Sequence, residues 1–301
     1  MKITLFYDHV TVLDYAYFSE HLGPVGHSQV VDVEFIGKTD HEGMLYDFSL
    51  AKKKVKEIID RECDHRFVVP KAMTTVKDGQ AHIKTSFGFG DEEIEYWCPA
   101  EGICEIPFAH VSDATLVTHL EELVMKEMPE TVSAIKLSLR SETLEPEASF
   151  FHYTHGLKDH YGNCQRLIHG HRSTLNIYRN SVRDYELEEL LATDTFSSCI
   201  HFVMWDNIVN KDEIIKSEDM EHPVGRLPNT PVVHITYESE QGVFTAKLPG
   251  KICYITPKET TVENLSIHFC SLIKSEYALE NEQITVNAFE GIGKGSTTTI
   301  V

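Results

Sequence analysis

Apolar and polar side chains alternate along several stretches of the chain, and this two-residue period predicts β-strands. Residues 2–6 open one such stretch, and Val31, Val33 and Phe35 alternate with polar neighbours in another, so residues 1–37 are expected to form strands. The same pattern, or a short apolar run, marks the ranges 81–105, 135–139, 169–177, 200–205, 232–237, 243–248 and 284–289. Glycines near the turn of 81–105 and the closeness of 232–237 to 243–248 predict two hairpins.

Helical spacing appears between these strands. Phe48, Ala51, Val55, Ile58 and Ile59 fall on one face of a predicted helix, which Asp47 or Ser49 can cap. Further helices are expected over 112–129, 184–191 and 261–273, the last with capping-box spacing from Thr260 to Glu263. Strands and helices in this order predict an α+β protein.

The order of elements repeats, which predicts two copies of one unit. Gly26-His27 matches Gly170-His171 at an offset of 144, and the helix stripe of residues 116–124 matches that of 265–273 at an offset of 149. The junction falls at 144–150, giving units 1–145 and 146–301. The first unit lacks the paired histidines of the second, so each half is expected to hold part of a site.

Composition and charge narrow the range of functions. The 301 residues carry a formal net charge of −20, which argues against nucleic acid and anionic membranes as partners. We read no signal peptide and no membrane-spanning stretch. The 7 cysteines form no disulfide-like framework, so a cytoplasmic location is expected. The 17 histidines exceed what packing requires.

The candidate chemistry lies in the stretch from His152 to Tyr178, which contains five histidines and Cys164. If His169-Gly170-His171 is in a strand, both imidazoles point to the same face and can bind one metal ion. His155 is the nearest good candidate for a third ligand. Three histidines with an open fourth position are typical of a catalytic zinc site.

These residues, with others, resemble the 6-pyruvoyl-tetrahydropterin synthase and 6-carboxytetrahydropterin synthase family. The most specific part is Cys164 followed by His169-Gly170-His171. The weaker parts are the segments 154–157, 261–264, 289–290, 43–48, 64–65 and 142–143. The resemblance implies a tandem T-fold (tunnelling fold), with antiparallel sheets, helices on one face, and a homo-oligomer that closes into a barrel with sites between neighbouring units.

The resemblance also implies roles for individual residues. His155, His169 and His171 would hold Zn²⁺, Cys164 would be the proton-transferring base, and Asp64-His65 would be the partner relay. Glu290 or Glu142 would bind the amino and ring N–H groups of a pterin, and Thr261 is a further substrate-binding candidate. Arg166, Arg172 and Lys294 are candidates for a triphosphate.

Each candidate also has a simpler interpretation. Cys164 could be an inert loop cysteine, and Asp64-His65 could be a helix C-terminal feature in which His65 interacts with the helix dipole. Glu142 could be a surface residue, whereas the glycines after Glu290 favour a functional role there. These alternatives stay open at the level of the sequence.

The expected activity is that of a zinc-dependent lyase acting on 7,8-dihydroneopterin triphosphate or a close pterin. Four residues separate Cys164 from His169, whereas the family resemblance implies three in carboxy-forming and five in pyruvoyl-forming enzymes, so the spacing does not choose the product. Two alternatives are a pterin- or purine-binding protein without turnover, and a scaffold protein with a structural metal site.

Overall fold

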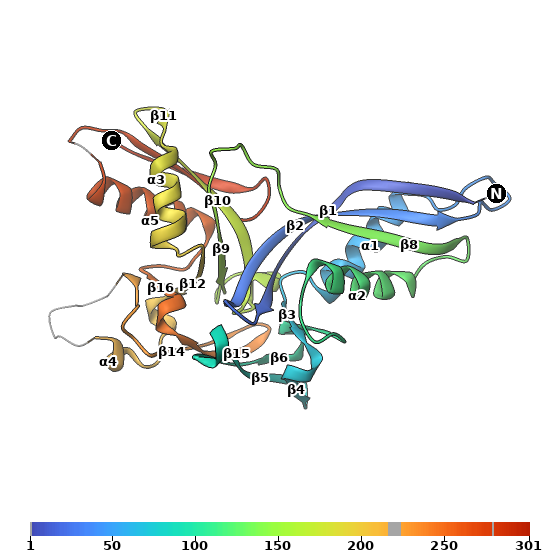
Figure 1. The fold of residues 1–301 in the computed structure, drawn as a ribbon, viewed down its shortest axis with the longest axis horizontal. Coiled ribbons are helices and arrows are strands. Elements are labelled where there is room, and N and C mark those ends of the chain that lie inside the picture. Colours follow the sequence, from blue (N-terminus) through green and yellow to red (C-terminus); the bar gives the residue numbers. More distant parts are fainter. Residues whose placement is uncertain (1, 216–223, 279) are drawn as a thin grey trace.

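Three β-sheets organise the chain in a computed structural model that describes residues 2–215, 224–278 and 280–301. One sheet belongs to the first half (residues 1–145), one to the second half (146–301), and the third is shared by both. In Figure 1 the first half extends to the right, the second half lies on the left, and the shared sheet lies below their junction.

The first half forms a five-stranded sheet in the order β7-β3-β1-β2-β8. Its strands are β1 (Ile3–Ser19), β2 (Gly23–Gly37), β3 (Phe67–Pro70), β7 (Ile103–Ile106) and β8 (Val132–Arg140), and its helices are α1 (Phe48–Glu62) and α2 (Asp113–Met125). Apolar side chains of both helices pack with those of β1, β2 and β8 in one core. The long β1–β2 hairpin reaches from the outer end of this half to the junction (Figure 1).

The second half forms an eight-stranded sheet in the order β13-β16-β12-β9-β10-β17-β18, with β11 also paired to β10. Its strands are β9 (Phe150–His155), β10 (His169–Arg179), β11 (Val182–Arg183), β12 (Cys199–Met204), β13 (Gly225–Arg226), β16 (Cys253–Thr256), β17 (Ile284–Phe289) and β18 (Gly295–Ile300). Its helices are α3 (Tyr185–Leu190), the π-helical turn η5 (Leu191–Thr195), α4 (Lys211–Ile214) and α5 (Val262–Glu276). Residues of α3, η5 and α5 form a core with β9, β10, β12 and β17.

The shared sheet joins the hairpins of the two halves in the order β14-β15-β6-β5-β4. Its strands are β4 (Thr74–Lys77), β5 (Gln80–Phe87), β6 (Glu92–Pro99), β14 (Val232–Ser239) and β15 (Gly242–Pro249). Ala246 of β15 pairs with Tyr96 of β6, so backbone hydrogen bonding continues across the two halves. One face of this sheet packs in a core with residues of β1, β3, β12 and β16.

The two main sheets repeat the same strand order, since β7-β3-β1-β2-β8 corresponds to β16-β12-β9-β10-β17. The registers also correspond: Gly26 pairs with Ala16 in one hairpin, and Gly170 pairs with Thr154 in the other. Both sheets are mixed, because β3 and β12 lie parallel to their neighbours on both sides. The predicted antiparallel sheets are therefore mixed, with parallel pairing on both sides of β3 and of β12.

The structure confirms one predicted helix cap and differs from the sequence prediction at two other helix ends. Asp47 caps α1 as predicted, by accepting hydrogen bonds from the backbone N–H groups of Ser49 and Leu50. The helix predicted over 112–129 ends earlier, at Met125. Thr261, not Thr260, is the N-cap of α5, so the Thr260–Glu263 capping box is wrong, and the hydroxyl of Thr260 is available to another partner.

The two halves meet where β2 crosses β9 and β10. A Cβ atom on Gly26 would lie 1.8 Å from the Tyr153 backbone oxygen, and one on Gly170 would lie 2.8 Å from the Gly26 Cα. Neither position has room for a side chain, so the two equivalent glycines let the backbones touch. This contact places the inner end of the β1–β2 hairpin beside His169 and His171 of β10.

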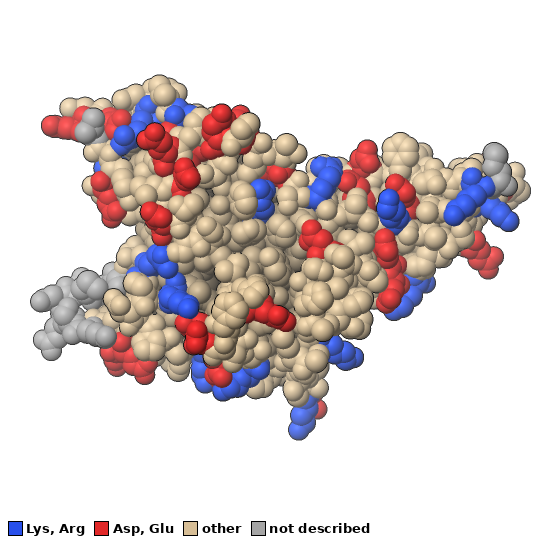
Figure 2. Space-filling model, viewed as in Figure 1, with Lys and Arg blue, Asp and Glu red and all other residues tan. Residues whose placement is uncertain are grey.

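The surface and the remaining segments add little to the site. No helix in the described ranges is both long and apolar enough to cross a membrane. Figure 2 shows charged side chains of both signs scattered over this face, without a continuous basic patch. Of the polar segment 210–230, α4 and β13 are ordered elements, and residues 216–223 lie outside the described ranges.

Candidate active site

The three predicted metal ligands lie together in the interior of the second half. His155 ends β9, and His169 and His171 lie two residues apart on β10, where the period of the strand turns both to one face. All three side chains are fully buried, and one ligand atom of each lies within 4.8 Å of the others. The strand and the grouping predicted from the sequence are both present.

Hydrogen bonds fix the orientation of two of the rings. His155 Nδ1 lies 3.1 Å from the Thr260 carbonyl oxygen and 2.9 Å from its hydroxyl, and His169 Nδ1 lies 2.7 Å from the Arg166 carbonyl oxygen. Because a carbonyl oxygen only accepts, each Nδ1 carries the proton and each Nε2 presents a lone pair. In both rings the Nε2 atom is buried without a hydrogen-bond partner among the described residues.

This donor set fits a divalent cation. Orphaned buried nitrogens are rare because each costs free energy, and here those of His155, His169 and His171 gather at one place. Burial, followed by neighbouring histidine charges, lowers the pKa of both His155 and His169 well below the usual range, which keeps the rings neutral. Neutral imidazoles are the form that binds metal, and three of them suit Zn²⁺.

Cys164 lies beside this cluster on a 3-10 turn, Gly162–Gln165, between β9 and β10. The loop is closed by a 2.9 Å hydrogen bond from the Leu157 N–H to the Cys164 carbonyl oxygen. The Cys164 side chain is partly exposed, and its sulfur lies within 4.8 Å of ring nitrogens of His65 and His169. The thiol therefore lies near a buried histidine of the second half and near His65 of the first half.

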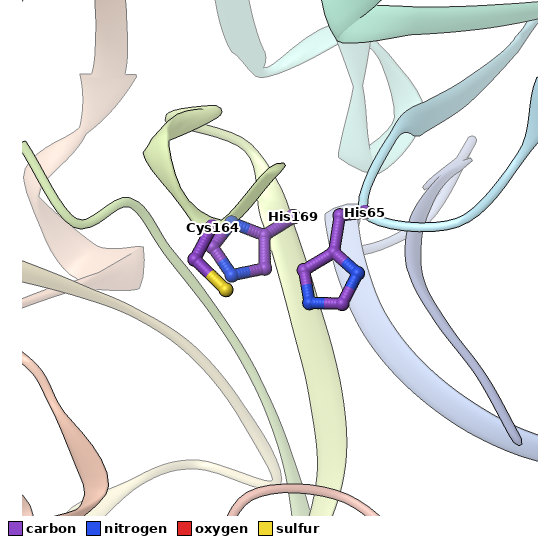
Figure 3. Close-up of side chains that lie close together, drawn as sticks. All are labelled: His65, Cys164 and His169. Carbon is purple, nitrogen blue, oxygen red and sulfur yellow. The ribbon is translucent and has the colours of Figure 1, made fainter. Parts of the chain in front are cut away.

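Asp64 and His65 reach the cluster from the first half, at the turn between α1 and β3. His65 Nδ1 lies 2.6 Å from Asp64 Oδ2, and the two side chains are 14% and 16% exposed. His65 has a positive φ of 54°, held by a 2.7 Å hydrogen bond from its N–H to the Asp14 carbonyl oxygen. Figure 3 shows His65 facing His169 and Cys164 from the opposite ribbon.

The surroundings of His65 favour its protonated form. Burial lowers the pKa of His65, but hydrogen bonds to Asp64 and Cys164 raise it more, to about 10. An imidazolium between a carboxylate and a thiol can donate a proton and can stabilise the thiolate as an ion pair. The arrangement suits acid–base chemistry on a bound molecule next to the three histidines.

Glu290 follows β17 and enters the same cluster. Its Oε1 lies 3.7 Å from His171 Nε2, and the side chain is 19% exposed. Gly291 and Gly293 follow with positive φ angles, and they turn the chain back into β18. Glu290 therefore lies beside the Nε2 atom of His171.

The other predicted substrate residues lie differently. Glu142 is partly exposed in the segment after β8, and its charge acts on Arg172. The Thr261 hydroxyl caps α5 by accepting from the Asn264 N–H. Arg166 is only 3% exposed and donates a 3.2 Å hydrogen bond to the Asp64 carbonyl oxygen, so it supports the Asp64-His65 turn from the second half.

Two supporting residues escaped the sequence analysis. Thr260 orients His155, and Asp14 of β1 places Oδ1 3.1 Å from His171 Nδ1. Thr260 adjoins the helix cap, and Asp14 is the charged residue in the otherwise uncharged range 10–18 of β1, which is the signal that could have indicated it. Neither position becomes significant until the two halves are placed together.

The equivalent position of the first half lacks the ligands. By strand register, Tyr17, Val25 and His27 correspond to His155, His169 and His171. The pairing of His201 with Thr154 in the second half corresponds to that of Phe67 with Ala16 in the first half. Counted back from these pairs, Ser198 and Cys199 at the start of β12 correspond to Asp64 and His65. Within the described residues, the two groups that could hold a metal both include His169 of β10.

Comparison with known proteins agrees with the resemblance found in the sequence. Residues 15–136 match the family model of 6-pyruvoyl tetrahydropterin synthase. The chain therefore resembles this family as predicted, and the α+β T-fold is confirmed. The matched range lies in the first half, whereas the metal-type histidines lie in the second, which repeats the same strand order. A pterin-synthase function is supported at this general level.

Solved structures give a weaker likeness. A catalytic-residue mutant of 6-pyruvoyltetrahydropterin synthase from Plasmodium vivax is 18% identical, with a TM-score of 0.38, and the alignment covers 46% of this chain and 91% of that chain. The Plasmodium falciparum enzyme is 20% identical, with a TM-score of 0.37 and coverages of 47% and 91%. These values add no argument to the family match. No curated protein matches the chain.

Proposed function

We propose that the chain is a zinc-dependent pterin synthase, a lyase that converts 7,8-dihydroneopterin triphosphate or a close pterin into a 6-substituted tetrahydropterin. The observation that carries the proposal is the convergence of three buried histidines with Cys164 and His65, which come from opposite halves. The family match of residues 15–136 supports the pterin class of substrate. The geometry supports acid–base chemistry rather than simple binding.

His155, His169 and His171 would hold the metal ion through Nε2. A Zn²⁺ ion bound there would polarise hydroxyl groups of the substrate side chain and acidify the adjacent C–H bonds. The buried position of the three rings would exclude bulk water from that side of the substrate. The residues of the chain then supply the orientation and the proton transfer.

Cys164 and His65 are the two proton carriers in this proposal. The Cys164 sulfur would take a proton from a carbon of the substrate side chain, and the His65 imidazolium would deliver one on the other side. Asp64 would hold the His65 ring through Nδ1, which leaves Nε2 for the transfer. Arg166 would maintain this turn against the second half through the Asp64 carbonyl oxygen.

Substrate recognition is assigned to carboxylates. Glu290 would accept hydrogen bonds from the amino group and the ring N–H of the pterin, since it lies beside His171 with one edge open. Glu142 and Thr261 stay secondary candidates, because no contact joins either of them to the histidine cluster among the described residues. The product, pyruvoyl or carboxy, is left open by this geometry.

The proposal extends to the organisation of the molecule. We infer two T-fold units, 1–145 and 146–301, of which the first supplies Asp64 and His65 and the second supplies the metal ligands, Cys164 and Glu290. Homo-oligomers that close a barrel, a cytoplasmic location and a small-molecule partner remain part of the same proposal.

One experiment tests the function directly. Metal content and turnover of 7,8-dihydroneopterin triphosphate are measured for the parent, for His169→Ala/His171→Ala, and for Cys164→Ala. We expect about one zinc per chain in the parent and in Cys164→Ala, and loss of zinc in the double variant. Turnover should fall about 10²–10⁴-fold in Cys164→Ala. A parent without zinc would overturn the proposal, and zinc with pterin binding but no turnover would indicate a non-catalytic binding protein.

A further inference from the structure

A buried carboxylate of the first half lies against a metal-ligand candidate of the second half. Asp14 of β1 is 3% exposed, and its Oδ1 atom lies 3.1 Å from Nδ1 of His171, which is fully buried. Nδ1 and Oδ1 are in close polar contact, without the alignment of a linear hydrogen bond. Its two atoms come from strands of different halves.

The Asp14 carboxylate is itself held in place. Its Oδ1 atom accepts a 2.5 Å hydrogen bond from the Ser28 hydroxyl, and its Oδ2 atom lies 3.0 Å from Lys294 Nζ. The backbone of Gly291 closes over it, because a Cβ atom there would lie 2.4 Å from Oδ1.

The three histidines differ in what holds their Nδ1 atoms. His155 is held by Thr260 and His169 by the Arg166 carbonyl oxygen, and both partners belong to the second half. His171 faces a carboxylate from the first half. A carboxylate at Nδ1 fixes the tautomer, directs Nε2 toward the metal, and makes the ring a stronger ligand. For His171, the carboxylate comes from across the junction.

Residue 14 also fixes the proton relay through its backbone. Its N–H donates a 3.1 Å hydrogen bond to Asp64 Oδ1, and its carbonyl oxygen accepts from the His65 N–H. One position of β1 therefore contacts Asp64 and His65 through the main chain and His171 through the side chain. A substitution that keeps the backbone and changes only the carboxylate separates these two contributions.

We propose that Asp14 is a positioning residue that orients His171 for metal binding, so that the first half sets part of the metal affinity of the second half. This inference rests on the proposed metal site, and it adds a dependence between the halves that the site alone does not require. It predicts that the affinity for Zn²⁺, as well as turnover, depends on Asp14.

The test measures Zn²⁺ affinity of the full chain by competition with a chromophoric chelator, and the absorption spectrum after loading with Co²⁺. The variants are Asp14→Asn, Ser28→Ala and, as a matched control, Asp32→Asn, whose carboxylate in β2 binds His9 and Arg140 instead. We expect Asp14→Asn to weaken Zn²⁺ binding about 10–100-fold and to shift the Co²⁺ spectrum. Ser28→Ala should give a smaller loss in the same direction, and Asp32→Asn should bind like the parent.

Folding and function are kept separate in this test. Circular dichroism shows whether Asp14→Asn is folded, and if it is not, Ser28→Ala decides the question because it leaves the charge in place. Parent-like Zn²⁺ affinity in a folded Asp14→Asn, or in Ser28→Ala if Asp14→Asn does not fold, would overturn the positioning role. A parent that binds Zn²⁺ but does not turn over a pterin would contradict the proposed function and leave the dependence on Asp14 measurable.

Discussion

At the scale of single residues, the sequence identifies side chains whose chemistry depends on local spacing. His169 and His171 could be placed on one face because a strand has a two-residue period, and they do share that face. Asp64-His65 could be noticed as a pair but not located, because its position beside Cys164 depends on how the halves meet. Asp14 had no local pattern that would connect it to His171.

The first prediction concerns His65 as a proton carrier. His65→Ala should lower kcat about 10²–10⁴-fold while leaving zinc content unchanged, because the imidazole transfers a proton and does not hold the metal. Steady-state kinetics and metal analysis on the same preparations give the two values. His160→Ala is the matched control, since the side chain of this exposed histidine in the Cys164 loop contacts the Tyr161 carbonyl oxygen and no residue of the cluster among the described residues. Full activity of His65→Ala would show that the site is not composite.

At the scale of elements, the sequence predicts helices and hairpins, which depend on neighbouring residues. It does not predict pairing between strands that are distant in the chain. The cap of α1 is confirmed, and so are the hairpins β5–β6 and β14–β15. The predicted apolar stripe of α1 is buried except for Phe48, which is 55% exposed and lies outside the core. The range 81–105 was expected to be one hairpin, but β7 leaves it to pair in parallel with β3 in another sheet. No short-range signal indicates that pairing, because it depends on residues far apart in the chain.

The second prediction concerns the crossing of β2 with β9 and β10. Gly26→Ala should destabilise the folded chain by about 1–3 kcal/mol, because its new Cβ atom would overlap the Tyr153 backbone oxygen, which cannot move like a side chain. Denaturant unfolding measures the loss. We also expect weaker zinc binding, since the same crossing positions Asp14 against His171.

The control for this substitution is Glu34→Ala on the same strand, where the side chain is exposed and only 3.9 Å from Lys136 in a surface pair. It should change stability by less than about 0.5 kcal/mol. Equal stability of Gly26→Ala and the parent would mean that the halves do not pack at this crossing in solution.

At the scale of the whole molecule, the repeat explains both the fold and the asymmetry of the site. The matching strand orders place His27 at the position of His171, as the offset between Gly26 and Gly170 predicted. The sequence predicted that each half would hold part of a site, but it could not show which residues of the two halves would meet. That result depends on the shared sheet and the glycine contact, which bring Asp64 and His65 to the second half and leave Ser198 and Cys199 at the equivalent position.

The last prediction uses this equivalence to rebuild a ligand set. His27 has a buried Nδ1 without a hydrogen-bond partner among the described residues, and burial, His152 and Arg172 lower the pKa of His27 to about 3. Tyr17→His/Val25→His would place two further imidazoles at the positions equivalent to His155 and His169. If the two hairpins are true copies, zinc content should rise from about one to about two per chain.

The control variant Tyr17→Ala/Val25→Ala removes the same side chains without adding nitrogens, and its zinc content should stay at the parental value. A histidine variant that folds and still binds only the parental amount would show that matching strand register does not carry the ligand geometry, and that the loop with Cys164 and the carboxylate of Asp14 are needed as well.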